Sequence, residues 1–414
     1  MISSLIDSNP YSAIHEQYAE NAAFLWVLRN NAIDQPHYLA SDIKDIEQRI
    51  HTQLQGLYTA PDLAWEICQN ALHFEEGGEA FTATLVAFHS EDAQKIQVVI
   101  EAAAMNENMF KGVASALSWL APHTILPWVS KLLKSKDLEH KYLAITYISQ
   151  TRVQPGEYLT TLLNREDCQQ HSRLYARCLR LVGELKLHTA MPLLQQAQAN
   201  DNDNVQFWAA WSQVMLGEKS ALNTIKKFTQ HDIYQHTASD VYVRAADAPS
   251  AKQFISQLAK NPASHRQAVK ACAAFGDPQS IDWLIGIMAQ TPLAKLAAEA
   301  FEHITGIHIE QQNLQLDTHT IESLGLNNIA DDHLDLDEDE NLLWPNVEKI
   351  KTLWQQQRHQ YKQGQRYFYG AALNPASLEM HIQQGAQRRR HWAATELALL
   401  RHKMPLINTK VKQL

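Results

Sequence analysis

The sequence predicts an all-α protein, an α-solenoid of short HEAT-like helical repeats with helical N- and C-terminal flanks. Three observations predict this fold: a recurring helix–Gly–helix unit, only 14 Gly and 14 Pro in 414 residues, and a hydrophobic content of 45%. So few turn-forming residues disfavour an all-β protein, which needs many tight turns. A pair of short helices cannot bury its own apolar faces and must stack on neighbours. The unit is clearest in residues 172–195, 205–226 and 265–287.

Residues 1–76 are expected to form a helical cap or small bundle that differs from the repeats. Apolar side chains follow helical spacing over residues 11–31. Ser41 is the expected N-cap of a second helix, because its hydroxyl can accept from a free backbone N–H. Pro61 suits the first turn of a third helix, where its missing N–H costs nothing. The second helix shows one apolar stripe, formed by Ile43, Ile46, Ile50, Leu54 and Leu57.

Residues 77–306 are expected to hold the repeats. Their turns are expected near Ala121, Thr151, Gly183, Gly217 and Gly276, at intervals of 30, 32, 34 and 59 residues. Intervals of about 30–34 residues are typical of an α-solenoid, and the last interval fits two units with a divergent repeat over residues 231–260. The sequence patterns of tetratricopeptide and ankyrin repeats are absent, so short HEAT-like units fit best.

Residues 307–345 are expected to form an acidic connector. Its run DDHLDLDEDE, residues 331–340, is interpreted as solvated and mobile rather than packed. Asp335, Asp337 and Asp339 alternate as in an EF-hand. However, Glu340 and Asn346 stand where that loop needs its glycine and its bidentate glutamate. No calcium site is therefore predicted.

Residues 346–414 are expected to form a basic helical segment, with helices over residues 347–363 and 377–400. This segment carries 12 Lys and Arg against 3 Asp and Glu, although the whole chain has a net charge of −9. The rest of the chain is therefore strongly acidic, and an acidic body of this size repels nucleic acid. The sequence predicts no nucleic-acid partner.

Several classes of protein and site find no support. Residues 1–28 contain no Lys or Arg, which disfavours a secretory signal, and no apolar run reaches the roughly 18–20 residues that span a bilayer. We expect a soluble cytoplasmic protein without membrane insertion. Cys178 and Cys272 lie on apolar helix faces and are expected to be buried thiols. HExxH, zinc-spaced Cys/His clusters, GxSxG, GxGxxG and P-loops are missing, so we predict no catalytic residues, metal or cofactor.

The candidate partner-binding residues lie in the basic segment. Arg388, Arg389 and Arg390 are consecutive on an expected helix, where steps of about 100° spread them around the axis, so all three cannot face one ligand. One or two of them are expected to pair with the acidic connector or with a partner; the alternative is solvation alone. Tyr367 and Tyr369 add aromatic surface in the glycine-bounded segment GQRYFYG.

Six segments in order along the chain support a family resemblance: residues 15–38 (HEQYAENAAFLWVLRNNAIDQPHY), 48–57 (QRIHTQLQGL), 299–306 (EAFEHITG), WPN at Trp344, QRYFYG at Gln365, and 387–399 (QRRRHWAATELAL). In these segments the chain resembles a bacterial HEAT-repeat family of conserved hypothetical proteins, often encoded near type VI secretion genes. The resemblance implies a HEAT-repeat fold and carries over no functional residues. The secretion link is a genomic association and does not by itself establish a function.

Three functions remain open from the sequence. The first is a non-catalytic scaffold or adaptor that binds a protein partner, such as a type VI secretion component, effector or effector chaperone. The second is an immunity-like inhibitor of a toxin. The third is a HEAT-repeat enzyme, such as a lyase-like modifying protein, which a deep pocket with converging ionisable side chains would favour.

Overall fold

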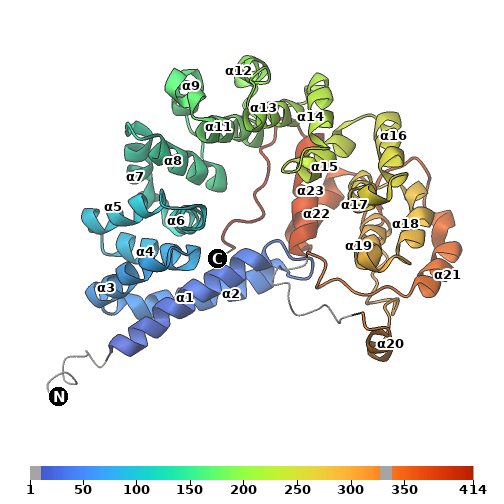
Figure 1. Cartoon of the computed structure of the whole chain (residues 1–414), viewed down its shortest axis with the longest axis horizontal. Coiled ribbons are helices and arrows are strands. Elements are labelled where there is room, and N and C mark those ends of the chain that lie inside the picture. Colours follow the sequence, from blue (N-terminus) through green and yellow to red (C-terminus); the bar gives the residue numbers. More distant parts are fainter. Residues whose placement is uncertain (1–10, 327–337, 414) are drawn as a thin grey trace. The chain divides into compact units, whose positions relative to one another are not determined.

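The protein is all-α in its described part, with 23 α-helices and one two-stranded hairpin (Figure 1). The computed structural model describes residues 11–326 and 338–413, so Asp335 and Asp337 lie outside the described residues. None of the described helices is both long enough and apolar enough to cross a bilayer. The described chain divides into unit 1, residues 11–34, 38–209 and 408–413, and unit 2, residues 35–37, 210–326 and 338–407.

Unit 1 is built from helices that pack on their neighbours in sequence. α1 packs along α2, and α4 lies against α1, α3 and α6. α8 continues this row with contacts to α6, α7 and α11. The helices are α1 (Ser12–Ala32), α2 (Ala40–Tyr58), α3 (Pro61–Ala71), α4 (Gly77–His89), α5 (Ala93–Ala102), α6 (Glu107–Trp119), α7 (Pro122–Lys134), α8 (Leu138–Thr151), α9 (Glu157–Asn164), α10 (Glu166–Gln170), α11 (Ser172–Leu185), α12 (Met191–Ala197) and the first part of α13 (Asp203–Met215).

The N-terminal helices share a core with the helices that follow them. Trp26 of α1 stacks on Phe81 of α4 with 5.6 Å between ring centroids, and Phe81 meets Trp119 of α6 edge to face. The Trp26 indole N–H donates to Ser115 Oγ at 2.9 Å, which satisfies its only donor inside the core. Aromatic side chains thus join the first helix to the beginning of the predicted repeat region.

Two local expectations for unit 1 need correction. Ser41 is not an N-cap, because α2 begins at Ala40 and the Asp42 carboxylate accepts from the Leu39 N–H at 2.8 Å. The turn expected near Gly183 comes a few residues later, because Gly183 itself lies inside α11. That helix continues to Leu185, and Lys186 takes the left-handed conformation with φ +59°. By contrast, Pro61 begins α3 as predicted.

Unit 2 continues with shorter helices, several of which follow a 3₁₀ turn. α15 packs on α14, α16 and α17, and α17 packs on α19, while α22 packs along α23. The helices and strands are the last part of α13, α14 (Leu222–Phe228), α15 (Gln235–Ala245), α16 (Ala248–Ala259), α17 (His265–Phe275), α18 (Ile281–Ile287), α19 (Ala294–Thr305), α20 (Thr318–Ser323), α21 (Val347–Gln357), β1 (Tyr367–Phe368), β2 (Ala371–Ala372), α22 (Pro375–Gln384) and α23 (Gln387–Leu400).

The β1–β2 hairpin is antiparallel and docks on the ends of two helices. The Tyr367 N–H donates to the carbonyl of Gly276, which ends α17, and the Tyr369 N–H donates to the carbonyl of His303 near the end of α19. Both helices end in a left-handed glycine, Gly276 with φ +76° and Gly306 with φ +69°. At both ends the hairpin backbone occupies the space that a Cβ atom would need.

A buried ion-pair network ties α23 to the rest of unit 2. Glu396 is 1% exposed and accepts from Arg244 Nη1 at 2.7 Å and from Arg366 Nη2 at 2.8 Å. Arg366 also donates to the backbone carbonyls of Phe275 and Ala274. Some charges of the basic segment are therefore neutralised by ion pairs within unit 2.

The structure corrects three expectations for the C-terminal part. The first helix ends at Gln357 rather than 363. The expected helix over residues 377–400 is two helices, because Gly385 and Ala386 take extended backbone angles between α22 and α23. At the end of the acidic run Asp339 is packed rather than solvated, whereas Glu338 and Glu340 are exposed. Glu338 and Asp339 form ion pairs with Arg266 at 3.2 and 2.6 Å, and Asp339 is 5% exposed.

Candidate functional site

The candidate partner-binding residues separate into two groups. Arg388, Arg389 and Tyr369 line one cavity of about 390 Å³ in unit 2, whereas Arg390 and Tyr367 lie elsewhere. Arg390 is buried and its Nε donates to the carbonyl of Ile382 at 2.7 Å. The Tyr367 hydroxyl accepts from the Lys362 N–H at 2.9 Å. Of the three arginines, Arg388 and Arg389 therefore line this cavity and Arg390 does not.

This arginine cavity lies between α19 and the N-terminus of α23. Ionisable side chains of both helices converge there, together with Tyr369 of the hairpin: Lys295, Glu299 and Glu302 from α19, and Arg388 and Arg389 from α23. Three arginines in the first turn of α23 are unfavourable for its dipole, whose N-terminal end is positive. The carboxylates of α19 offset that repulsion, and so the two helices are held together by charge.

Most of these charged groups are already paired. Arg388 Nη1 donates to both carboxylate oxygens of Glu299, at 3.0 and 2.8 Å, and its Nη2 donates to the carbonyl of Glu338 at 2.8 Å. The sequence predicts that one or two arginines pair with the acidic connector or with a partner; Arg388 contacts the connector through a backbone carbonyl and forms its ion pair with Glu299 of α19. Burial raises the pKa of Glu299, while Arg388 beside it opposes the rise. Lys295 donates to the carbonyl of Glu340 at 3.1 Å.

Arg389 is held more loosely than Arg388. Its guanidinium lies over the Tyr369 ring at 3.6 Å from the centroid, and its nearest carboxylate oxygen, on Glu302, is 3.6 Å away. Glu302 makes a shorter contact, 2.7 Å, with His308 Nδ1. Burial raises the pKa of Tyr369, so its hydroxyl stays protonated at neutral pH. The cavity therefore combines fixed charge pairs with one cation stacked on an aromatic ring.

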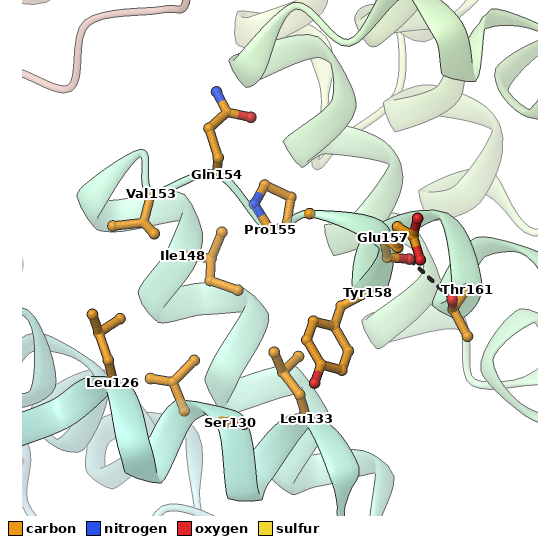
Figure 2. A pocket seen from close by; sticks show the side chains of 12 residues that line it. Leu126, Ser130, Leu133, Ile148, Val153, Gln154, Pro155, Glu157, Tyr158 and Thr161 are labelled. Carbon is orange, nitrogen blue, oxygen red and sulfur yellow. Dashed lines mark hydrogen bonds between the residues drawn. The ribbon is translucent and has the colours of Figure 1, made fainter.

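A second hollow, the apolar groove, lies in unit 1 among α7, α8 and α9 (Figure 2). Its volume is about 620 Å³. The floor is formed by the buried side chains of Val129, Leu133 and Ile148. Leu126, Val153 and Tyr158 stand at the rim, and Figure 2 shows them facing the same space as the floor residues.

The groove exists because the chain between α8 and α9 turns sharply. Arg152 ends α8 in the left-handed conformation with φ +58°, and Gly156 precedes α9 with φ +57°. α9 then packs on α10 and α11, while α7 packs on α8. The space between α7 and α9 is left to the apolar side chains that line it.

The structure offers little for metal or thiol chemistry within its described part. No group of three or more His, Cys, Asp or Glu side chains converges there to hold a metal ion. Cys178 and Cys272 are buried as predicted, and so are Cys68 and Cys168. Burial raises the pKa of Cys68 and Cys272 to about 12, so these thiols are protonated and unreactive at neutral pH.

Sequence reasoning missed the carboxylates of the arginine cavity and the whole apolar groove. Glu299 and Glu302 lie in EAFEHITG, a segment that contributes to the family resemblance, and that was their only signal. No sequence motif marks the groove. Its residues occupy ordinary helix and loop positions, and only the folded structure brings α9 near α7.

No protein-family model, curated protein or solved structure matches the chain. The likeness to the family associated with type VI secretion therefore remains a prediction from the sequence segments that carry it.

Proposed function

We propose that the protein is a non-catalytic scaffold or adaptor that binds a protein partner in the apolar groove of unit 1. One observation carries the proposal: Leu126, Val153 and Tyr158 are 41%, 38% and 40% exposed over a buried apolar floor. A contiguous apolar surface that faces water is costly, and such surfaces mark interaction sites. The helical pairs of α4–α19 are, in this proposal, HEAT-like repeats that present the groove.

The occupant that fits best is an amphipathic helix of the partner. α7 and α9 border the groove, so a helix can lie between them with residues at positions i, i+3 or i+4 and i+7 on the apolar floor. Most of the lining is apolar, and its polar side chains are Ser130, Gln154, Glu157 and Thr161 besides the Tyr158 hydroxyl. The Thr161 hydroxyl already donates to the Glu157 carbonyl at 2.9 Å. This lining favours apolar contact over the recognition of a charged ligand.

The proposed partner is a type VI secretion component or effector, and the proposed location is the cytoplasm. Support for the partner comes from the family resemblance that the sequence segments carry. The arginine cavity is the main support for an enzyme, since ionisable side chains converge there. Its carboxylates and arginines are largely paired with one another, and we therefore favour binding.

A photo-crosslinking amino acid at Tyr158 tests occupancy of the groove directly. In cells that express a type VI secretion cluster, we expect the Tyr158 variant to crosslink one specific protein, because that side chain stands at the rim. The control places the same amino acid at Phe74, which is 72% exposed and lies outside the groove. Equal crosslinking from both positions, or none from Tyr158, would count against the proposal.

The strength of the interaction is then measured with the purified partner. Val153→Asp places a charge on the apolar rim, and we expect it to weaken the affinity about 10- to 100-fold, since one buried apolar side chain contributes roughly 1.5–3 kcal/mol. Val98→Asp is the matched control, because Val98 of α5 is also 38% exposed and does not line the groove. Titration calorimetry should show an unchanged affinity for the control.

A further inference from the structure

Residues 408–413 form an irregular segment that lies on unit 1. Figure 1 shows this end of the chain, in red and marked C, close to α1 and α2. The segment has neither helix nor strand, and Thr409 is its one fully buried residue, at 4% exposure. It is held by contacts to four helices of unit 1, namely α1, α2, α6 and α8.

A buried ion pair binds the backbone of this segment through hydrogen bonds. Arg29 of α1 donates to Glu47 of α2 from Nε at 3.1 Å and from Nη2 at 3.0 Å, and the two side chains are 5% and 0% exposed. Arg29 Nη2 also donates to the carbonyl of Lys410 at 2.7 Å. The Gln413 N–H donates to Glu47 Oε2 at 2.7 Å. The ion pair therefore offers a donor to the backbone carbonyl of one residue and an acceptor to the backbone N–H of a residue three positions later.

This use of the ion pair explains how unit 1 tolerates two buried charges. Buried charges cost free energy unless further hydrogen bonds satisfy the donors and acceptors that the pair leaves over. Burial lowers the pKa of Arg29, and Glu47 opposes that shift. Each partner would lose one hydrogen bond if the segment left, so the surface favours having some backbone bound there.

Side-chain contacts add a preference for lysine at two positions. The Lys410 ammonium pairs with Asp34, and the Lys412 ammonium lies over the Trp119 ring at 5.0 Å from its centroid. Asn408 Nδ2 donates to the carbonyl of Gln150 at 2.9 Å. An acidic side chain and an aromatic face thus recognise lysines two residues apart, and a backbone carbonyl recognises an amide before them.

We propose that Arg29, Glu47, Asp34, Trp119 and the Gln150 carbonyl form a clamp for a lysine-containing peptide segment of a partner protein. Residues 408–413 occupy the clamp in cis, and the partner segment, with the pattern Asn-x-Lys-x-Lys, displaces them. Displacement is feasible because the contacts are polar, and the exposed Lys410–Asp34 pair contributes little. Because residues 408–413 are covalently linked to the clamp, they compete with the partner at an effective concentration of about millimolar. The affinity of the clamp for its own segment therefore sets how tightly the partner binds. The clamp is separate from the apolar groove.

The test uses the full chain and a fluorescently labelled peptide of residues 405–413, PLINTKVKQ, followed by anisotropy. Lys412→Glu removes the contact with Trp119 and places a charge near Glu47, which unseats the resident segment. We expect the variant to bind the peptide at least tenfold more tightly than the wild-type chain does. A scrambled peptide of the same composition is the control, and circular dichroism of the variant establishes that it is folded.

A charge exchange checks the geometry of the clamp. In the Lys412→Glu background, Asp34→Lys should weaken binding of the peptide and favour a peptide with Glu in the place of Lys410. Asp34 is more than half exposed, so this change should leave folding intact. Equal affinity of wild type and Lys412→Glu for the peptide would make residues 408–413 a fixed strap and overturn the proposal. Concentration-dependent dimers that reject the peptide would overturn it too, since the segment would then exchange between copies.

Discussion

Glu184 of α11 is a single buried carboxylate on which three arginines converge. Its oxygens lie 2.8 to 3.0 Å from Arg152, Arg177 and Arg180, and they accept from Ser149 Oγ at 2.7 Å. Without the carboxylate, three positive groups would face one another in a partly buried place. We expect Glu184→Gln to lower the free energy of unfolding by about 3–5 kcal/mol, as when one partner of a buried ion pair is removed. Urea unfolding followed by circular dichroism measures the change.

The acid dependence of stability should change in the same variant. Burial alone would raise the pKa of Glu184, but Arg177, Arg180 and Arg152 outweigh it and lower the pKa to about 2. A carboxylate with a lowered pKa stabilises the folded state above its unfolded value of about 4.3, and this stabilisation disappears as the pH falls toward 2. Glu184→Gln should lack that part of the dependence. Glu379→Gln is the control, because its pair with Arg401 is exposed and contributes less than about 1 kcal/mol.

At the scale of elements, the hairpin and the ends of α17 and α19 form one assembly. Gly306 has φ +69°, and a Cβ atom there would lie 2.5 Å from the carbonyl oxygen of Tyr369. The Gly370 N–H donates to the carbonyl of Ile304 at 3.1 Å, so the hairpin cannot move away from α19 without losing this hydrogen bond. We expect Gly306→Ala to destabilise unit 2 by at least about 2 kcal/mol through strain and displacement of the hairpin.

Gly286 of α18 is the control for Gly306, and substitution there should have the opposite effect on stability. A Cβ atom there meets nothing within 4 Å, and its backbone is helical. Gly286→Ala should therefore raise the free energy of unfolding by up to about 1 kcal/mol, because alanine favours the helix and restricts the unfolded chain. Thermal unfolding of both variants measures the difference. If Gly306→Ala proved as harmless as Gly286→Ala, the close approach of the hairpin would be contradicted.

The sequence predicts elements well where apolar periodicity decides them. It places α1 and the first turn of α3, and it anticipates the glycine end of α17. It fails at Gly385, because helical spacing resumes on both sides of the break, and it gives no reason for a hairpin at Tyr367. Both outcomes depend on what the segment packs against, which local periodicity does not contain.

The candidate sites were less accessible to sequence reasoning than the helices. Arg388 and Arg389 stand out as a charge run, but only the packing of α23 on α19 reveals that Glu299 and Glu302 are their partners. Arg29 and Glu47 are 18 positions apart on different helices and look like ordinary helix residues until residues 408–413 lie on them. Long-range pairing of this kind leaves no spacing in one sequence that would identify it.

At the scale of the whole molecule, we predict that the basic segment does not bind nucleic acid. The chain carries a net charge of −9. Of the basic residues after 345, Arg366 pairs with Glu396, Arg388 with Glu299 and Lys410 with Asp34. We expect no saturable binding of a 30-base-pair duplex at micromolar protein and about 50 mM salt, because the net negative charge of the chain repels the duplex and these ion pairs weaken the basic segment's attraction for phosphate. Fluorescence anisotropy measures this, and tight binding that falls steeply between about 50 and 200 mM salt would contradict it.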